Sequence, residues 1–389
     1  MGNPRAFVSS SFVLLSLVLP AVGAATSPTL AFRSWNAYGP NVSAQLLLRA
    51  AKHLVTPRRT LLPDNSTAPR SLRDLGFTRF GVDDGWQDCG AGVNGSFHNR
   101  DGTPLVNSSR FPSVRQFCDS LHAMGLSCGF YMNNCGCAEK TFRDPDFIRS
   151  VYERSVAALG HWGVDEVKLD GCSQFRNTTL WQELLTRSRV DAPKFPLENC
   201  HNNYGSGLTH TSFPIDLASC PYTLFRTSSD IRPVWERVVH NLQSVVPYLA
   251  GTEQSLSRPG CLAFADMLEV GNLGPQARQC GPGCEADATS VSSFTEDRSH
   301  FSAWAITTSP LVLSTDLTNA TTLERIWPIV SNEEVLDINQ AWAGEAGRLV
   351  RTLPASGSGS FNNTAKNGSR VPGSYGLSGL NDRVCACGL

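Results

Sequence analysis

Short apolar runs alternate with longer amphipathic runs from about residue 30 to residue 340 of this chain. The apolar runs have the length of buried strands, and the amphipathic runs have the spacing of helices with one buried face. The predicted strands are Leu30–Trp35, Thr78–Val82, Ser127–Met132, Glu166–Leu169, Phe195–Glu198, Tyr222–Arg226, Leu262–Leu268 and Pro310–Leu313. The predicted helices between them are Ser43–Leu54, Ser113–Met124, Asp146–His161, Thr179–Ser188, Pro233–Val246 and Thr295–Ile306. This alternation predicts an α/β fold, a (β/α)8 barrel.

A doubly wound open sheet also alternates strands with helices. It predicts a glycine-rich phosphate-binding loop after an early strand, and the sequence contains none. The barrel is therefore the better interpretation of 389 residues, 41% of them hydrophobic, which suffice for a large core. In such a barrel the residues that carry chemistry lie at the carboxyl ends of the strands.

Charged residues stand at the carboxyl ends of four predicted strands. They are Asp83 and Asp84 after the second strand, Lys168 and Asp170 at the fourth, Arg226 and Asp230 at the sixth, and Asp266 at the seventh. Lys168 and Asp170 are two residues apart, so they point to the same side of their strand. In a barrel all these side chains surround one mouth.

Several carboxylates with two cations and a Trp around one cavity suit a sugar, whose hydroxyls donate hydrogen bonds to carboxylates. Hydrolysis of a glycosidic bond uses one ionised and one protonated carboxyl. Lys168 beside Asp170 favours the ionised form, which makes Asp170 the candidate nucleophile. Asp230 is then the candidate acid.

Part of this pattern also fits a purely structural role or a metal site. An Asp after a strand often caps a helix or turn, and either Asp84 or Asp230 fits that structural role alone. A carboxylate cluster can also hold Mg²⁺ or Ca²⁺. Lys168 and Arg226 in the same site argue against a cation, so we expect neither a metal nor a cofactor.

The two ends of the chain differ from the middle. Residues 1–24 are typical of a signal peptide, because Arg5 precedes the apolar run Phe12–Leu19 and small residues follow it. That run is shorter than the roughly 20 residues that span a bilayer, so we expect no membrane span. We assign residues 25–344 to the barrel. Residues 345–389, rich in Gly, Ser, Asn and Pro, are expected to form a short, partly disordered segment.

Cysteines and sequons also indicate a secretory route. The spacings of the 13 cysteines lack the paired ligand blocks of a zinc site, so disulfides are favoured, and the odd number leaves at least one thiol unpaired or paired outside the chain. Glycosylation sequons occur at Asn41, Asn65, Asn94, Asn107, Asn177, Asn319, Asn362 and Asn367. We expect a secreted protein or one in a lumen of the secretory pathway, extracellular, lysosomal or vacuolar. The net charge of −1 gives no attraction to nucleic acid.

In these motifs the chain resembles glycoside hydrolase family 27, the α-galactosidase and α-N-acetylgalactosaminidase family. The similarity runs in consistent order from Ser34-Trp35-Asn36 to about Asp337-Ile338-Asn339-Gln340. Its motifs are Asp83-Asp84-Gly85-Trp86, Gly129-Phe130-Tyr131, Lys168-Leu169-Asp170-Gly171-Cys172, Arg226 with Asp230, Asp266–Asn272, Ser302–Ile306 and Ser309-Pro310-Leu311.

The resemblance implies a retaining double displacement on terminal α-galactosyl residues, with Asp170 as nucleophile and Asp230 as acid/base. The substrate-binding residues that it implies are Trp35, Asp83, Asp84, Tyr131, Lys168, Arg226, Asp266 and Met267. It also implies that Cys172 bonds Cys135 or Cys137, and that Cys200 bonds Cys220. A carbohydrate substrate is the one partner implied; the oligomeric state is not indicated.

The sequence departs from the family pattern in four places. Gly85 replaces a Cys, although Cys89 is close enough to substitute in a bridge. Cys200-His201-Asn202-Asn203 replaces Cys-Glu-Trp in the loop that reads the sugar's 2-substituent. A Cys-bearing insertion covers about Pro275–Ala288. The family usually carries a C-terminal β-sandwich, and the roughly 45 residues after Gly344 are too few for one. We therefore expect a shortened tail, either natural or from an incomplete gene product.

Other functions remain open at this point. Related specificities are α-N-acetylgalactosaminidase, β-L-arabinopyranosidase and an isomaltose-releasing glucanase, and the loop His201–Tyr204 decides among them. A sugar-binding protein without catalysis is a different class, but it predicts a missing carboxylate, and both are present. The third possibility is a truncated chain that folds poorly without its C-terminal β-sandwich.

Overall fold

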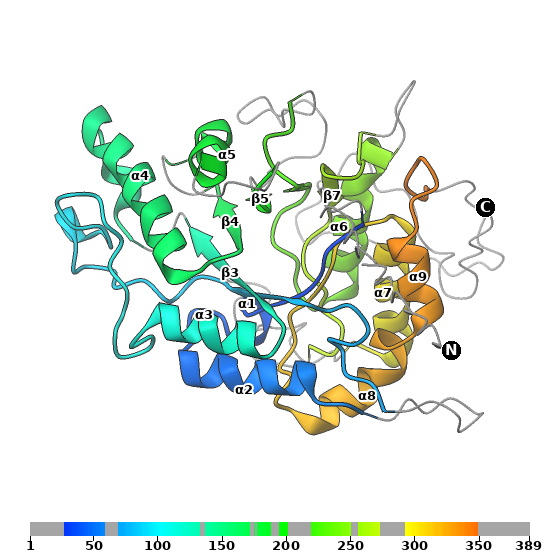
Figure 1. Cartoon of the computed structure of the whole chain (residues 1–389). Coiled ribbons are helices and arrows are strands. Elements are labelled where there is room, and N and C mark those ends of the chain that lie inside the picture. Colours follow the sequence, from blue (N-terminus) through cyan, green and yellow to red (C-terminus); the bar gives the residue numbers. More distant parts are fainter. Residues whose placement is uncertain are drawn as a thin grey trace, which may run out of the picture.

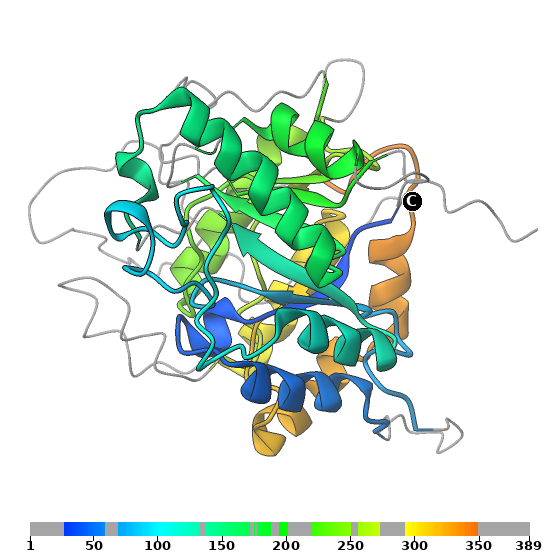
Figure 2. The same ribbon diagram turned by 60° about the vertical axis from the view of Figure 1, so that its left-hand side comes forward.

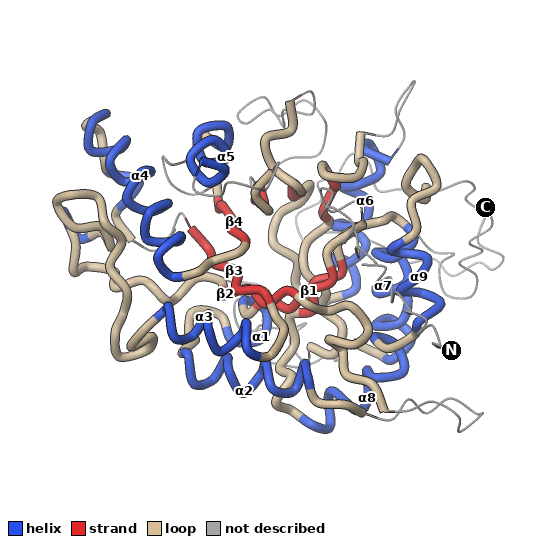
Figure 3. Tube along the Cα trace, in the orientation of Figure 1, coloured by secondary structure: helices blue, strands red, loops and turns tan. Residues whose placement is uncertain are grey.

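The computed structural model describes residues 27–58, 69–132, 137–171, 175, 177–187, 194–200, 219–249, 256–272 and 292–348. Within this part a parallel sheet lies inside a layer of helices (Figures 1, 2 and 3). The predicted signal peptide, the insertion Pro275–Ala288 and the segment 349–389 lie outside the described residues. No helix of the described part is long and apolar enough to cross a bilayer.

The sheet has eight parallel strands in the order β7-β6-β5-β4-β3-β2-β1-β8. They are β1 (Leu30–Arg33), β2 (Arg79–Val82), β3 (Ser127–Met132), β4 (Glu166–Asp170), β5 (Leu197–Cys200), β6 (Leu224–Arg226), β7 (Leu262–Phe264) and β8 (Leu311–Leu313). Its two edges meet beyond β7, where Leu268 forms a parallel bridge with Leu313 and its N–H donates to the Val312 carbonyl over 2.8 Å. The (β/α)8 barrel predicted from the sequence is confirmed.

Helices follow the strands and cover the outside of the sheet (Figure 3). They are α1 (Trp35–Tyr38), α2 (Ala44–Val55), α3 (Val114–Ala123), α4 (Pro145–Trp162), α5 (Thr178–Arg187), α6 (Trp235–Leu249), α7 (Phe294–Ile306), α8 (Ala320–Val330) and α9 (Glu333–Gln340). Ser43 and Ser113 cap α2 and α3, and Asp144 caps α4 ahead of Pro145. The sequence patterns did not predict α1, α8 or α9.

Two strands end earlier than predicted. Trp35 belongs to α1 and not to β1. The seventh strand stops at Phe264 because Asp266 has a φ of 96°, which breaks the extended backbone before Leu268 rejoins the sheet. Both breaks lie at the carboxyl ends of their strands.

The inside of the barrel is charged on one side and apolar on the other. On the charged side, Arg33 forms a buried ion pair with Glu198, and Arg79 lies 2.9 Å from Glu166. Gly129 pairs with Glu166, and a Cβ there would come within 2.6 Å of the Glu166 carboxylate. A residue without a side chain therefore makes room for this charge. The apolar side is formed by Ala31, Leu224, Leu262, Phe264, Met267 and Val312.

The disulfides correct one of the implied pairings and exclude one of the two alternatives given for the other. Cys220 bonds Cys261 and not Cys200. Cys220 and Cys261 both precede their strands at the amino end of the barrel, whereas Cys200 ends β5 at the opposite end. Cys137 bonds Cys89, the substitute bridge that the sequence suggested, so Cys137 does not bond Cys172. Cys135 and Cys172 lie outside the described residues.

A further disulfide, Cys118–Cys128, was not predicted. Of the sequon residues, Asn41, Asn94, Asn177 and Asn319 are exposed and Asn107 is half-buried. Asn65, Asn362 and Asn367 lie outside the described part. Asn177 and Asn319 use their side-chain oxygens to cap α5 and α8, which leaves the amide nitrogen, the atom that carries an N-glycan, outside these bonds.

Candidate active site

The charged residues singled out in the sequence gather at the carboxyl ends of the strands. Asp83 follows β2, Asp170 ends β4, Arg226 ends β6, and Asp266 follows β7. Asp170 lies within electrostatic range of Lys168, Arg226, Asp230 and Asp83. These five side chains therefore surround the same end of the barrel. This arrangement matches the position of active sites in this fold.

Lys168 forms a buried ion pair with Asp83. Its Nζ donates to Oδ2 over 2.7 Å, and the two side chains are 5% and 2% exposed. The same Nζ lies 5.4 Å from the centre of the Tyr131 ring. Burial is the largest single effect on the pKa of Lys168 and lowers it, but the charges of Asp83 and Glu198 are among several that together raise the pKa above its usual value, so the amine stays protonated. Asp83 is fixed further by its N–H, which donates to Ser34 Oγ over 2.9 Å.

Asp170 accepts a hydrogen bond on each carboxylate oxygen. The Tyr131 hydroxyl donates to Oδ2 over 3.0 Å, and the Gly171 N–H donates to Oδ1 over 2.6 Å. Burial raises the pKa of Asp170, and the charges of Lys168 and Arg226 oppose this without cancelling it. The sequence predicted that Lys168 keeps Asp170 ionised. The pKa moves the other way because burial dominates and Lys168 is paired with Asp83.

Arg226 joins the sixth and seventh strand ends. Its Nη2 contacts Asp230, its Nη1 lies 3.2 Å from Asp266 Oδ2, and its Nε donates to the Ser228 carbonyl over 3.1 Å. The guanidinium is buried, so the neighbouring carboxylates compensate its charge. Asp266 also accepts the Ile231 N–H on Oδ2 over 2.8 Å, which ties the two loops together.

Asp230 differs from the other carboxyls because its side chain is 60% exposed. Partial burial tends to raise its pKa, but the charge and hydrogen bond of Arg226, with Lys168, lower it overall. The resting group is therefore a carboxylate, whereas the sequence argument assigned it the protonated role.

Asp84 is the second carboxyl after β2. Burial and the neighbouring charge of Asp83 raise its pKa to about 6, and the Gly85 N–H, which donates to Oδ1 over 2.8 Å, opposes that rise. A carboxyl with this pKa accepts hydrogen bonds as a carboxylate at neutral pH and becomes a donor in mild acid.

The apolar wall of the mouth comes from two elements. Trp35, at the start of α1, is half-buried and packs against the apolar cluster inside the barrel. Met267, which belongs to that cluster, follows Asp266. The Trp304 indole supports this edge by donating to the Asp266 carbonyl over 2.8 Å. An apolar face beside carboxylates suits a pyranose ring.

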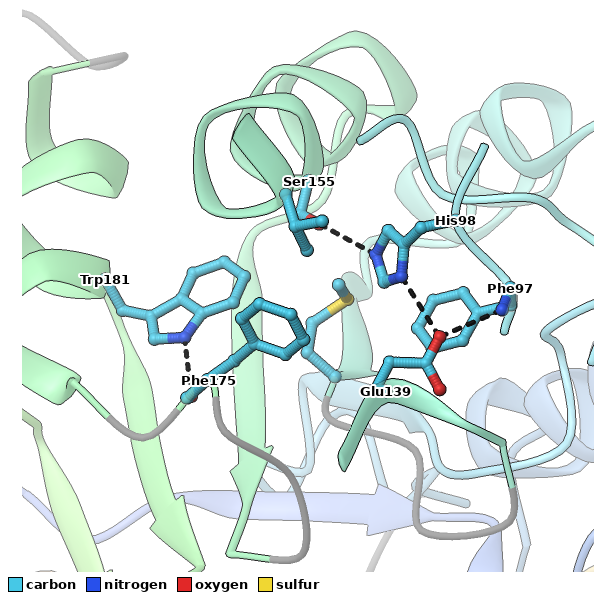
Figure 4. Close-up of a pocket in the computed structure, with 8 residues that line it drawn as sticks. Phe97, His98, Glu139, Ser155, Phe175 and Trp181 are labelled. Atoms are coloured by element: carbon cyan, nitrogen blue, oxygen red, sulfur yellow. Dashed lines mark hydrogen bonds and ion pairs between the residues drawn. The ribbon is translucent and has the colours of Figure 1, made fainter. Parts of the chain in front are cut away.

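A second polar cluster, formed by His98, Glu139 and Ser155, was missed by sequence reasoning (Figure 4). His98 Nδ1 is 3.1 Å from Glu139 Oε1, and His98 Nε2 is 3.3 Å from Ser155 Oγ. All three residues are buried among Phe97, Met132, Val151, Phe175 and Trp181, and the described residues leave no room for a water-sized molecule between them. The cluster fastens the loops after β2 and β3 to α4. Nothing in the sequence around His98 distinguishes it from a solvent-exposed histidine.

Every candidate catalytic and substrate-binding residue lies within the described part, at the carboxyl end of the barrel. The loop His201–Tyr204, which the sequence analysis expected to decide specificity, lies outside the described part. Among the described residues, sequence reasoning missed Ser34 and Glu269 near the mouth. Both stand inside motifs that the sequence singled out, but their roles depend on contacts between distant strands.

Comparisons with known proteins agree on one family. A family profile described as alpha galactosidase A matches residues 63–341, more than half of the chain. The alpha-galactosidase of Oryza sativa subsp. japonica is 25% identical over 337 residues, covering 85% of this chain and 67% of the rice protein. Alpha-galactosidase 3 of Arabidopsis thaliana is 24% identical over 332 residues, covering 85% of this chain and 64% of that protein. The chain thus spans less than two thirds of the Arabidopsis relative.

Solved structures show the same fold. The crystal structure of alpha-galactosidase I from Mortierella vinacea superposes with a TM-score of 0.58 at 22% identity, covering 85% of this chain and 77% of that one. At this identity the similarity supports the barrel architecture.

Proposed function

The chain belongs to the alpha galactosidase A family of glycosidases, and from this membership we propose that it is a retaining hydrolase of terminal α-galactosyl residues in oligosaccharides or glycoconjugates. The observation that carries the proposal is the position of Asp170. It lies at the end of β4 and accepts a hydrogen bond from the Tyr131 hydroxyl. The buried cations Lys168 and Arg226 and further carboxyls lie around it.

In the first step Asp170 acts as the nucleophile. Its carboxylate attacks the anomeric carbon and the bond to the leaving oxygen breaks. Asp230, which takes up a proton from solvent once it has left Arg226, gives that proton to the leaving oxygen. The Tyr131 hydroxyl and the nearby charges of Lys168 and Arg226 favour the ionised Asp170 that this step uses. The product is a glycosyl ester on Asp170.

In the second step Asp230 acts as the base. It takes a proton from water while the water oxygen attacks the anomeric carbon and displaces Asp170, so the configuration is retained. Because Arg226 lowers the pKa of Asp230 in the free site, Asp230 must leave Arg226 to serve as an acid. Its 60% exposed side chain supports this movement.

The remaining residues are assigned to the sugar. Asp83 and Asp84 accept hydrogen bonds from its hydroxyls, with Lys168 and Arg226 beside them, and Trp35, Tyr131 and Met267 form walls. Asp266 keeps Arg226 in place through their contact of 3.2 Å. A signal peptide at residues 1–24, secretion and N-glycosylation at the sequons belong to the same proposal, and three disulfides in the described part support an oxidising compartment.

The stereochemistry of the product tests the mechanism. Proton NMR during hydrolysis of 4-nitrophenyl α-galactoside should show α-galactose first, before mutarotation. Asp230→Ala should lose far more activity on a poor leaving group than on an aryl galactoside, because only the former needs protonation. First appearance of β-galactose, or equal losses on both substrates, would contradict the proposal.

A further inference from the structure

Glu269 is a buried acidic residue that the proposed mechanism does not use. It lies three residues after Asp266, and 3% of its surface is exposed. Asn36 Nδ2 donates to its Oε1 over 3.0 Å, and Asn272 Nδ2 donates to its Oε2. Burying a carboxyl costs free energy unless its oxygens are hydrogen-bonded. The two asparagine amides satisfy one oxygen each and so hold the Glu269 side chain in place.

The two partners of Glu269, Asn36 and Asn272, are both bonded to Ser314, so the network includes residues after three strands. Asn36 lies in α1 after β1, and its N–H donates to Ser314 Oγ, after β8, over 2.9 Å. Asn272 Nδ2 donates to the Ser314 carbonyl over 3.0 Å. Ser314 Oγ donates in turn to the Arg33 carbonyl over 2.6 Å. A closed set of hydrogen bonds therefore joins the carboxyl ends of β1, β7 and β8.

This network lies at the seam of the barrel. Between β7 and β8 the described backbone pairing is the bridge from Leu268 to Leu313. Leu268 immediately precedes Glu269. The hydrogen bonds of the Glu269 side chain therefore join the two edges of the sheet next to the backbone bridge. Without it, two neutral amides would be left buried with unpaired donors.

Trp35 stands between two fixed residues. On one side the Ser34 hydroxyl accepts the Asp83 N–H over 2.9 Å. On the other, Asn36 is held by Glu269 and Ser314. We infer that Glu269 is a positioning residue of the sugar site: through Asn36 it sets Trp35, and through its place in the chain it sets the edge formed by Asp266 and Met267.

This inference rests on the proposed function for its kinetic consequence. A wall that contacts the sugar equally before and during reaction changes KM more than kcat. A displaced wall loses part of its contact with the sugar, and a loss of about 1.4 kcal/mol in binding corresponds to a tenfold rise in Kd. Loss of Glu269 is therefore expected to weaken sugar binding while the chemistry at Asp170 continues.

The experiment compares three purified variants. Glu269→Leu removes both acceptors, and Glu269→Gln keeps the shape and one acceptor oxygen. Asn339→Leu is the matched control: Asn339 is also fully buried, and its Nδ2 donates to the Ser309 carbonyl over 2.9 Å at the amino end of β8. Kinetic constants on 4-nitrophenyl α-galactoside, calorimetric binding of D-galactose, and a crystal structure are measured for each.

We expect Glu269→Leu to raise KM and the galactose Kd about tenfold, with kcat within about threefold of wild type. Glu269→Gln should restore both to within about threefold. Asn339→Leu should lower the melting temperature yet leave KM unchanged. An unchanged KM in folded Glu269→Leu, or an equal change in Asn339→Leu, would overturn the inference.

Two further readouts keep the test decisive. If Glu269→Leu does not fold, Asn36→Ala removes the same link to Trp35 and should give the same rise in KM. If the wild-type protein hydrolyses no galactoside, the proposed function fails, but the crystal structures still decide the inference. Trp35 should move in Glu269→Leu and stay in Asn339→Leu; an unmoved Trp35 would refute the positioning role.

Discussion

At the scale of single residues, the carboxyls of the site differ in the group that stabilises their negative charge. Asp83 has an ammonium partner, Asp230 shares a guanidinium with Asp266, and Asp170 has a tyrosine hydroxyl. Burial raises the pKa of Asp170 and Asp266, whereas Arg226 lowers that of the exposed Asp230. Protonation in the free site is therefore set by these contacts more than by the identity of the residues.

The sequence located these residues but not their protonation. Their positions follow from strand ends and the two-residue period of a strand, which are local properties. Their pKa values depend on burial and on which carboxylate Lys168 reaches. Lys168 in β4 bonds Asp83 after β2, and these strands are far apart in the chain. No local sequence pattern predicts this contact.

Removal of the Tyr131 hydroxyl tests the electrostatics of Asp170. The hydroxyl donates to the carboxylate and favours its ionised form, so Tyr131→Phe should raise the pKa of Asp170 further. The acidic limb of kcat/KM against pH should then move to higher pH by about one unit, the value of a hydrogen bond to a charged group. Tyr152→Phe, which removes an α4 hydroxyl that accepts the Asn177 N–H, is the control. An acidic limb that stays in place would contradict the account.

At the scale of elements, the positions of the strands were easier to predict than the residues at which they end and the disulfides that connect them. Ser127–Met132 forms the predicted third strand in full because its apolar run and its hydrogen bonding coincide. The seventh strand was overestimated because the backbone turn at Asp266 leaves no mark on hydrophobicity. Cys220 was given the wrong partner because pairing depends on which strand ends share a face of the barrel.

The register of β3 against β4 predicts an effect of glycine substitution. Gly129→Ala places a Cβ 2.6 Å from the Glu166 carboxylate in the filled barrel, and we expect it to lower the free energy of unfolding by about 1–3 kcal/mol. Gly160→Ala lies in α4 with nothing within 4 Å of the added Cβ, and it should stabilise by about 0.4–1 kcal/mol. Urea unfolding of both variants measures the difference. Equal effects would show that the barrel interior accommodates the methyl group.

At the scale of the whole molecule, stability depends on buried acids. Burial raises the pKa of Glu269 from its usual 4.5 to about 8, although the Asn272 hydrogen bond opposes this. The folded protein then holds a proton that the unfolded chain has lost between these pH values. Its free energy of unfolding should fall as pH rises through this window.

Glu269→Gln cannot ionise, so it should remove this part of the pH dependence. We expect the stability of the variant relative to wild type to improve by a few kcal/mol between pH 5 and pH 8, measured by urea unfolding at several pH values. A relative stability that does not change with pH would show that Glu269 has the same protonation in the folded and unfolded states.

The central claim is hydrolysis of α-galactosides at Asp170, and a panel of glycosides tests it most directly. Purified protein is given the 4-nitrophenyl α-galactoside, α-N-acetylgalactosaminide, β-L-arabinopyranoside and α-glucoside, with Asp170→Asn as control. We predict that the α-galactoside is cleaved and that Asp170→Asn abolishes the cleavage while keeping the fold. Cleavage of another glycoside would move the specificity to a related activity. A folded protein that cleaves none of them, or an active Asp170→Asn, would contradict the account.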